Sequence, residues 1–380
     1  MKGLNSAACH KLQFEIQTGF QNFTNGKTKE TLESERTLID SAGVPLTDIR
    51  EVISSCETKL NKVQGSNFLI LGGTGFIGRW LISTLLEANS ELNLNLNITL
   101  VTRNARQATE ILGVKTTQNL EIVEFDLSRE VFHSNKPFEI AIHGATPSVP
   151  RTGSKDHELV FAASVNGAET ILFGAEKFRN SPRVINLSSG AVFGPQEPSM
   201  RNIPENSPYR INPFGYSKAK IETEKKLNAA DLVGKIKNTN ARLFAFFGPH
   251  LALDEHFAIG NFMRDGFRSK EILVKGNPAT RRSYLYITNL IEALIRLIDE
   301  PDIKRINVGN DNPISIKDLA ETFEQIFPKS QIKYQNDDSS ATNYVPGVAT
   351  LRERILIKDF LSLEDGIYRW KEWLRVTKWK

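Results

Sequence analysis

Three side chains that could together move a proton occur in this chain: Ser189, Tyr216 and Lys220. Tyr216 and Lys220 are four residues apart, so on a helix they would share one face. An ammonium group beside a phenol, together with a cofactor ribose, favours the phenolate and lowers its pKa from about 10. The tyrosine can then exchange a proton with a substrate oxygen while hydride moves at carbon. A Tyr/Lys pair at this spacing also arises by chance, so the neighbouring segments must support the interpretation.

The predicted strand 183–187 carries Ser188 and Ser189 at its carboxyl end, which is where doubly wound folds place their chemistry. The following segment, Gly190 to Gly194, is predicted to leave the sheet. A hydroxyl at this position could donate a hydrogen bond to a substrate oxygen beside Tyr216. We therefore predict Ser189, Tyr216 and Lys220 as catalytic residues, with Ser188 and Ser189 facing the substrate.

A glycine-rich turn indicates a dinucleotide cofactor. The apolar segment 68–71 runs directly into Gly-Gly-Thr-Gly-Phe-Ile-Gly and then into a helical pattern. Residues without a Cβ allow backbone N–H groups to approach a pyrophosphate, and the third glycine lets the helix pack closely on the sheet. The context of strand, turn and helix supports the motif. The predicted cofactor contacts here are Gly72, Thr74, Gly75, Phe76, Ile77 and Gly78.

The residues that follow the second predicted strand bear on the choice of cofactor. Dinucleotide folds that select NAD place an acidic residue there to hold the ribose 2′-hydroxyl. This chain instead has Thr102-Arg103-Asn104, and Arg103, with Arg106 nearby, could pair with a 2′-phosphate. We therefore expect NADP(H) in preference to NAD(H), the alternative being that Arg103 is a solvated loop residue. Asp126, after the third strand, is predicted either to contact the adenine amine or to stabilise a turn.

The elements needed to position these residues are visible as alternating strand and helix patterns. Strands are predicted at 68–71, 98–101, 120–125, 140–142, 184–187 and 241–247, with helical segments between most of them. This alternation predicts an α/β fold, a doubly wound parallel sheet of the Rossmann type with a smaller C-terminal substrate-binding domain. The expected divisions are a polar N-terminal extension (1–45), a docking helix (46–65), a dinucleotide-binding domain (66–250) and a substrate-binding region (251–380, with 195–210 contributing).

Composition excludes several other functions. The formal net charge is +4 over 380 residues, which gives no reason to expect nucleic-acid binding. Cys9 and Cys56 are far apart, and the six histidines have no ligand spacing, so we expect neither disulfides nor a metal. Because no apolar run approaches the roughly 20 residues of a membrane span, and the N-terminus lacks a signal-peptide pattern, we expect a cytoplasmic protein without membrane partners.

Taken in order, the motifs resemble those of the epimerase/dehydratase family of extended short-chain dehydrogenases, over roughly residues 66–380. They are GGTGFIG, Asp126-Leu127, His143-Gly-Ala-Thr146, Val165-Asn-Gly167, SSGAVFG, YSKAK and Ile306-Asn-Val-Gly309. The resemblance implies a nucleotide-sugar substrate and a homodimer. It also implies cofactor contacts at Leu127, Gly144, Ala145, Thr146, Asn166 and Phe244, and contacts to a nucleotide diphosphate at Asn261, Phe262 and Arg282.

The chain also departs from the pattern of this family. Family dehydratases carry an Asp-Glu pair directly after the catalytic hydroxyl, and sugar-acid decarboxylases carry a Glu near it, whereas this chain has Gly190-Ala191. The local sequence is similar to that of UDP-galactose 4-epimerase, although Ala245 replaces an asparagine of many relatives. We expect an epimerase that transiently oxidises a sugar carbon of the C4 type. The alternatives are an NADPH-dependent 4-keto-sugar reductase, a 4,6-dehydratase, and a non-catalytic dinucleotide-sensing scaffold.

Overall fold

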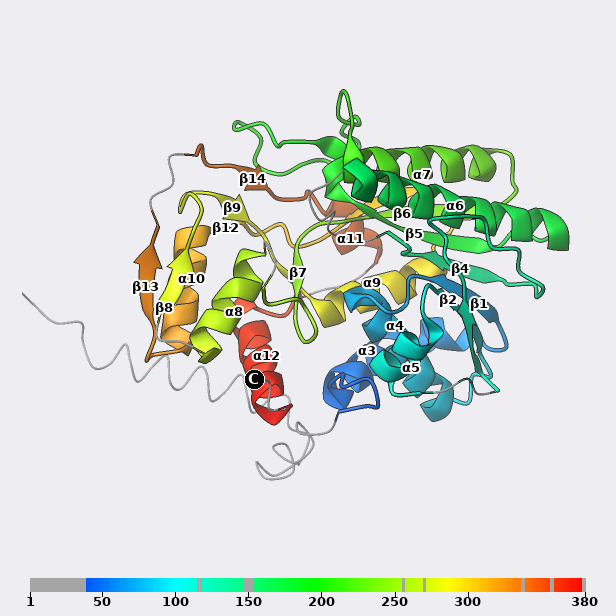
Figure 1. Cartoon of the computed structure of the whole chain (residues 1–380), viewed down its shortest axis with the longest axis horizontal. Coiled ribbons are helices and arrows are strands. Elements are labelled where there is room, and N and C mark those ends of the chain that lie inside the picture. Colours follow the sequence, from blue (N-terminus) through cyan, green and yellow to red (C-terminus); the bar gives the residue numbers. More distant parts are fainter. Residues whose placement is uncertain are drawn as a thin grey trace, which may run out of the picture.

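A parallel seven-stranded sheet forms the centre of the molecule in the computed structural model (Figure 1). The structure describes residues 39–377 except 115, 117, 147–153, 255–256, 269–270, 336–338 and 356–358. In spatial order the strands are β11 (Arg305–Val308), β6 (Lys237–Leu243), β5 (Arg183–Ser189), β4 (Ile140–His143), β1 (Asn67–Leu71), β2 (Asn97–Thr102) and β3 (Leu120–Glu124). The strand order reverses beside β1, which is the place where doubly wound sheets bind ligands. The predicted Rossmann-like fold is confirmed.

Helices cover both faces of this sheet because its strands are apolar on both sides. Leu69 and Leu71 pack in one core cluster, with residues of α6 (Ser154–Phe178) and α7 (Gly215–Leu232). Phe68 and Ile70, which point the opposite way, pack in a second cluster. That cluster includes residues of α3 (Leu46–Asn61), α4 (Phe76–Glu91), α5 (Ala105–Leu112) and α9 (Ile287–Ile298). Figure 1 shows α6 and α7 side by side, with the other four helices across the sheet.

The predicted boundary at residue 250 does not divide the chain into two continuous domains. After residue 286 the chain returns to the large sheet. There α9 and β11 join it, and β11 pairs in parallel with β6. An apolar crossover helix followed by a buried strand is the unit that extends a parallel sheet. The smaller region beside this sheet, called the small region below, is therefore built from two separate segments, one before α9 and one after β11.

The small region carries short strands and helices at the left of Figure 1. Its β8 (Glu271–Val274) pairs with β13 (Gln331–Tyr334), beside α8 (Ala258–Arg268) and α10 (Ile316–Ile326). A three-stranded sheet has the order β12 (Ile314–Ser315), β9 (Arg281–Arg282) and β14 (Asn343–Tyr344). The remaining elements are η1 (Gly190–Phe193), β7 (Phe246–Phe247), β10 (Leu285–Tyr286), α11 (Ala349–Arg354) and α12 (Leu363–Val376).

Helix α3 occupies most of the segment predicted as a docking helix and packs against α4 and α9. Its buried Asp48 accepts hydrogen bonds from the Tyr286 hydroxyl (2.8 Å) and from the Arg369 guanidinium (2.9 Å). These bonds join α3 to β10 and α12. Residues 1–38 of the predicted polar extension lie outside the described residues. Among the helices that the structure describes, none is long and apolar enough to cross a membrane.

Candidate active site

The glycine turn between β1 and α4 leaves space where a ligand could approach the backbone. A Cβ on Gly72, whose φ is +90°, or on Gly78 would collide with neighbouring backbone, so close packing accounts for these two glycines. A Cβ on Gly75 would meet nothing within 4 Å. Gly75 is exposed and is the N-cap of the 16-residue helix α4, with no side-chain cap and no acidic residue in the first turn. The turn therefore has room for the pyrophosphate of a dinucleotide. The pyrophosphate would accept hydrogen bonds from the backbone N–H groups of the first turn of α4.

The residues predicted for the adenosine end lie after β2 and β3. Arg103 is exposed just beyond β2, and its charge contributes to lowering the pKa of Asp126. The Asp126 carboxylate also accepts hydrogen bonds from the backbone N–H (3.0 Å) and the hydroxyl (2.7 Å) of Ser128 and pairs with Arg129. Asp126 thus stabilises its own turn while lying close to Arg103. Arg106, the second candidate cation, pairs instead with Glu110 on an exposed helix face.

Residues of helix α6 contact the segments that follow β3 and β4. The Asn166 side chain donates to the Leu127 carbonyl (2.9 Å), and the Thr146 hydroxyl lies 2.8 Å from that of Ser164. The Gly144 N–H donates to the Leu71 carbonyl (2.8 Å), which brings the segment Gly144-Ala145-Thr146 beside the glycine turn. These predicted cofactor residues therefore border the same switch point of the sheet.

Ser189, Tyr216 and Lys220 are brought together by β5 and α7. The Ser189 hydroxyl lies within hydrogen-bonding reach of the Tyr216 phenol. The Lys220 ammonium lies 5.5 Å from the centroid of the Tyr216 ring and donates to the Leu187 carbonyl (2.6 Å). The two side chains share one helix face, as their spacing predicts. Lys220 is anchored to the backbone of the strand that carries Ser189.

Burial controls the charges of these groups. Burial raises the pKa of Tyr216 to about 12, opposed by the hydrogen bond with Ser189. Burial also lowers the pKa of Lys220 to about 7, opposed by the carboxylate of Glu224. Desolvation of the phenolate is thus the largest effect of the protein on this pKa, and the lowering by Lys220 together with a cofactor ribose stays a prediction about the cofactor-bound site.

Ser188 points to the side of β5 opposite that of Ser189, because successive residues of a strand point to opposite sides. Its hydroxyl donates to the fully buried Glu224 (2.5 Å). The same carboxylate accepts from the Tyr209 hydroxyl (2.8 Å) and from the Arg242 guanidinium (2.7 to 3.2 Å). The prediction that Ser188 faces the substrate is thus not supported by its side-chain contacts. Its bond with Glu224 instead joins β5 to α7.

Tyr344, which the sequence analysis did not select, reaches Ser189 from the small region. The Ser189 hydroxyl lies within hydrogen-bonding reach of its phenol as well as that of Tyr216. The Tyr344 ring packs at 4.7 Å from the ring of Phe244, a predicted cofactor neighbour. No local pattern marks Tyr344, because it lies in a polar stretch more than 150 residues after Ser189.

The three residues predicted to hold a diphosphate differ in their surroundings. The Arg282 guanidinium donates to the carbonyl and the hydroxyl of Thr342, and burial lowers its pKa. The Asn261 side chain accepts from Arg264 (3.3 Å). The Phe262 side chain is 2% exposed and packs on Phe323 in the core of the small region. Phe262 could therefore contact a ligand only through its backbone, since its ring is the apolar anchor of α8.

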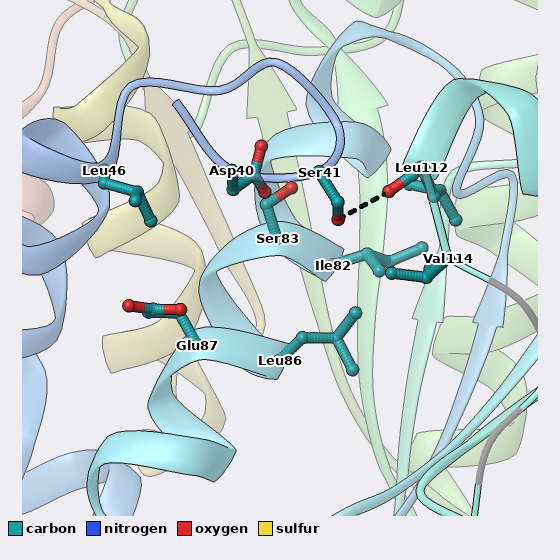
Figure 2. A pocket seen from close by; sticks show the side chains of 9 residues that line it. All are labelled: Asp40, Ser41, Leu46, Ile82, Ser83, Leu86, Glu87, Leu112 and Val114. Carbon is teal, nitrogen blue, oxygen red and sulfur yellow. Dashed lines mark hydrogen bonds between the residues drawn. The ribbon is translucent and has the colours of Figure 1, made fainter. Parts of the chain in front are cut away.

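A cavity of about 240 Å³ lies elsewhere, between the segment before α3 and helices α4 and α5 (Figure 2). The Ser41 hydroxyl donates to the Leu112 carbonyl (3.0 Å) across this cavity. Its lining residues are Asp40, Ser41, Leu46, Ile82, Ser83, Leu86, Glu87, Leu112 and Val114. None of the predicted site residues is among them, so the cavity is separate from the candidate active site.

Comparison with known proteins agrees with the motifs. The model of the NAD dependent epimerase/dehydratase family matches residues 68–309. The chain is 24% identical over 305 residues to UDP-glucuronic acid decarboxylase 3 of Arabidopsis thaliana, covering 79% of this chain and 86% of that protein. It is also 24% identical over 320 residues to UDP-N-acetyl-alpha-D-glucosaminuronate decarboxylase of Bacillus cytotoxicus, covering 81% and 97%.

Two solved structures show the same fold. A UDP-N-acetylglucosamine 4-epimerase from Methanobrevibacter ruminantium superposes with a TM-score of 0.70 at 18% identity, covering 83% of this chain and 99% of that one. A UDP-glucose 4-epimerase from Thermotoga maritima superposes with a TM-score of 0.66 at 17% identity, covering 82% and 99%.

Proposed function

Because this chain belongs to the NAD dependent epimerase/dehydratase family, we propose that it is an NADP-linked epimerase of a UDP-sugar, acting by transient oxidation of a ring carbon of the C4 type. The observation that carries the proposal is the grouping of Ser189, Tyr216 and Lys220 beside the open glycine turn. The neighbouring Gly190 and Ala191 add no carboxylate, so the grouping provides one proton-transfer group and no elimination pair.

In this mechanism Tyr216 exchanges one proton with the sugar hydroxyl, and Ser189 donates a hydrogen bond to the same oxygen. A bound oxidised dinucleotide would supply the hydride acceptor for this reaction, and its positive nicotinamide ring would favour the phenolate. Tyr216 returns its proton when the ketone is reduced, so the proton count is unchanged. Lys220 must be protonated to assist the phenolate, and its anchor at the Leu187 carbonyl holds the ammonium in place.

The preference for NADP(H) rests on Arg103. It is the exposed cation at the end of β2, in the position where an acidic residue would hold a free 2′-hydroxyl. A guanidinium there would form charge-assisted hydrogen bonds with a 2′-phosphate. The Asp126 carboxylate, which is bonded to Ser128 and paired with Arg129, adds a negative charge near this arginine.

Decarboxylation of a UDP-sugar acid is the second candidate, because the curated relatives bear that name. The same first step would serve it: oxidation at C4 makes a β-keto acid, whose carboxyl group at C5 leaves as CO₂. The two reactions therefore diverge only after the hydride transfer. They can be separated only by their products.

The test is incubation of the purified protein with UDP-glucose, UDP-galactose, their N-acetylamino counterparts and UDP-glucuronic acid, each with NADP⁺ or NAD⁺. We expect interconversion of two epimers, detected by NMR, with no net change in dinucleotide absorbance. Release of CO₂ from UDP-glucuronic acid would identify a decarboxylase instead. Stoichiometric oxidation of NADPH with a 4-keto-sugar would identify a reductase, and a 4-keto-6-deoxy product a dehydratase.

A further inference from the structure

Tyr344 fills the space that Gly190 leaves open beside the catalytic serine. A Cβ built on Gly190 would lie 2.5 Å from the Tyr344 hydroxyl oxygen and 2.6 Å from the Phe244 ring. The missing side chain thus makes room for a phenol from a distant strand. In turn, that phenol lies within hydrogen-bonding reach of Ser189, with the Tyr216 phenol close by.

The hydrogen-bonding capacity of Ser189 indicates what this second phenol does. A hydroxyl accepts two hydrogen bonds and donates one. The Ala191 N–H already donates to the Ser189 oxygen (3.1 Å). Burial raises the pKa of Tyr344 above its ordinary value, so this phenol keeps its proton and can donate as well. If the Tyr344 phenol donates to the second acceptor position, the single Ser189 hydrogen is left for the remaining neighbour, which is Tyr216 or a substrate oxygen.

The strand that carries Tyr344 also holds Arg282. Strand β14 pairs in parallel with β9, placing Tyr344 opposite Arg282. The Arg282 guanidinium donates to the Thr342 carbonyl and to the Thr342 hydroxyl, both at 3.0 Å. An anion bound by this arginine would therefore affect the position of β14, the strand that carries Tyr344 to Ser189.

We propose, building on the epimerase function proposed above, that Tyr344 is a positioning residue that orients the Ser189 hydroxyl. Through Thr342, strand β14 links this orientation to the diphosphate group that Arg282 would bind. Binding energy from the diphosphate, which does not react, would then be used to align the group that assists hydride transfer. The role requires the Tyr344 hydroxyl and not merely its ring.

The first experiment is a double-mutant cycle on kcat with the UDP-sugar that the wild type epimerises. Tyr344→Phe keeps the ring packing on Phe244 and should lower kcat about 10-fold, the worth of one hydrogen bond in a buried network, with KM changed less than about 2-fold. In a Ser189→Ala background the same change should have no further effect. The control is Tyr334→Phe, which removes a phenol hydroxyl from the same region at a residue that is 47% exposed, and should leave kcat unchanged.

The link to Arg282 is tested by Thr342→Val, which removes one acceptor of the guanidinium. This change should lower kcat in the wild type but not in Tyr344→Phe. Equal losses in both backgrounds would show that β14 carries no coupling. The proposal is wrong if the effects of Tyr344→Phe and Ser189→Ala on kcat are additive. It is also wrong if Tyr344→Phe alters KM and leaves kcat intact, because Tyr344 would then contact the sugar directly and not act through Ser189.

A crystallographic comparison keeps this test separate from the test of the proposed function. Crystal structures of the wild type and Tyr344→Phe need no substrate. We expect a single Ser189 rotamer in the wild type and a second rotamer in the variant. A variant with the same single rotamer would overturn the positioning role even if the enzyme is an epimerase. Conversely, failure to turn over any nucleotide sugar would refute the proposed function and leave this structural result to decide the role of Tyr344.

Discussion

Replacing Glu224 with glutamine should destabilise the fold strongly, because its carboxylate is fully buried and paired with a charge. Glu224 is 0% exposed, and the side chain of its partner Arg242 is 3% exposed. The guanidinium donates to both carboxylate oxygens, at 2.7 to 3.2 Å. Hydroxyl groups of Ser188 and Tyr209 donate to the same oxygens. Glutamine keeps the size of the side chain but presents a single acceptor oxygen and no charge.

The expected loss arises because the arginine is left without a counter-charge. Removing one partner of a buried ion pair costs about 3–5 kcal/mol of unfolding free energy. Because the glutamine oxygen can still accept part of the network, we expect about 3 kcal/mol, the lower end of that range. A matched control is Glu169→Gln on α6, whose partner Lys226 lies on α7 like Glu224, with side-chain exposures of 40% for Glu169 and 33% for Lys226. An exposed pair of this kind contributes less than about 1 kcal/mol.

Urea denaturation of the wild type and both variants measures these differences. A Glu224→Gln variant within about 1 kcal/mol of the wild type, like the control, would refute the reasoning, since the buried pair would then contribute no more than an exposed one. The charge of Glu224 also raises the pKa of Lys220 against the effect of burial. If protonated Lys220 is needed, activity is lost as pH rises through its pKa. The alkaline loss of kcat should therefore begin at lower pH in Glu224→Gln, and at an unchanged pH in the control.

Four further predictions test the site and the assembly. Gly75→Val should abolish dinucleotide binding, measured by titration, because the side chain would enter the open space above the turn; a folded variant with unchanged affinity contradicts this. Arg103→Asp should reverse the preference for NADP(H) over NAD(H), and tighter NAD(H) binding by the wild type would show that β2 was misinterpreted. Tyr216→Phe should keep cofactor binding and lower turnover by roughly 10²–10⁴, so an undiminished rate would exclude this tyrosine as the proton-transfer group. The chain should sediment as a dimer through α6 and α7, and Leu159→Glu should weaken it, because Leu159 is 51% exposed on α6; a monomeric wild type at micromolar concentration would refute the assembly.

The parts of the fold that the sequence predicted well are those set by local pattern. The buried strand before Gly72 and the helix that begins at Phe76 identify the first β–α unit, because apolar runs and residues without a Cβ leave few alternatives. The spacing of Tyr216 and Lys220 likewise determines that they share a helix face. Each of these inferences needs only residues within about two turns of one another.

Predictions that depended on the surroundings of a side chain were less successful. The sequence shows two adjacent serines at the end of β5, but only the packing of α7 determines that Ser188 meets Glu224 while Ser189 faces Tyr216. The pKa of Tyr216 likewise depends on packing, because burial raises it to about 12 while the hydrogen bond with Ser189 opposes this shift.

Gly190 shows most directly why one position in a sequence does not define a site. Read alone, a glycine after Ser189 indicates only that no acidic side chain follows this serine. In the folded chain the space beside Gly190 is filled by another residue, because a Cβ on Gly190 would lie 2.5 Å from the Tyr344 hydroxyl. The two residues come together only because β14 pairs with β9 at the edge of the small region, more than 150 residues along the chain. Which groups face a bound sugar is therefore decided by how the small region packs over the end of β5, and Gly190 permits that packing.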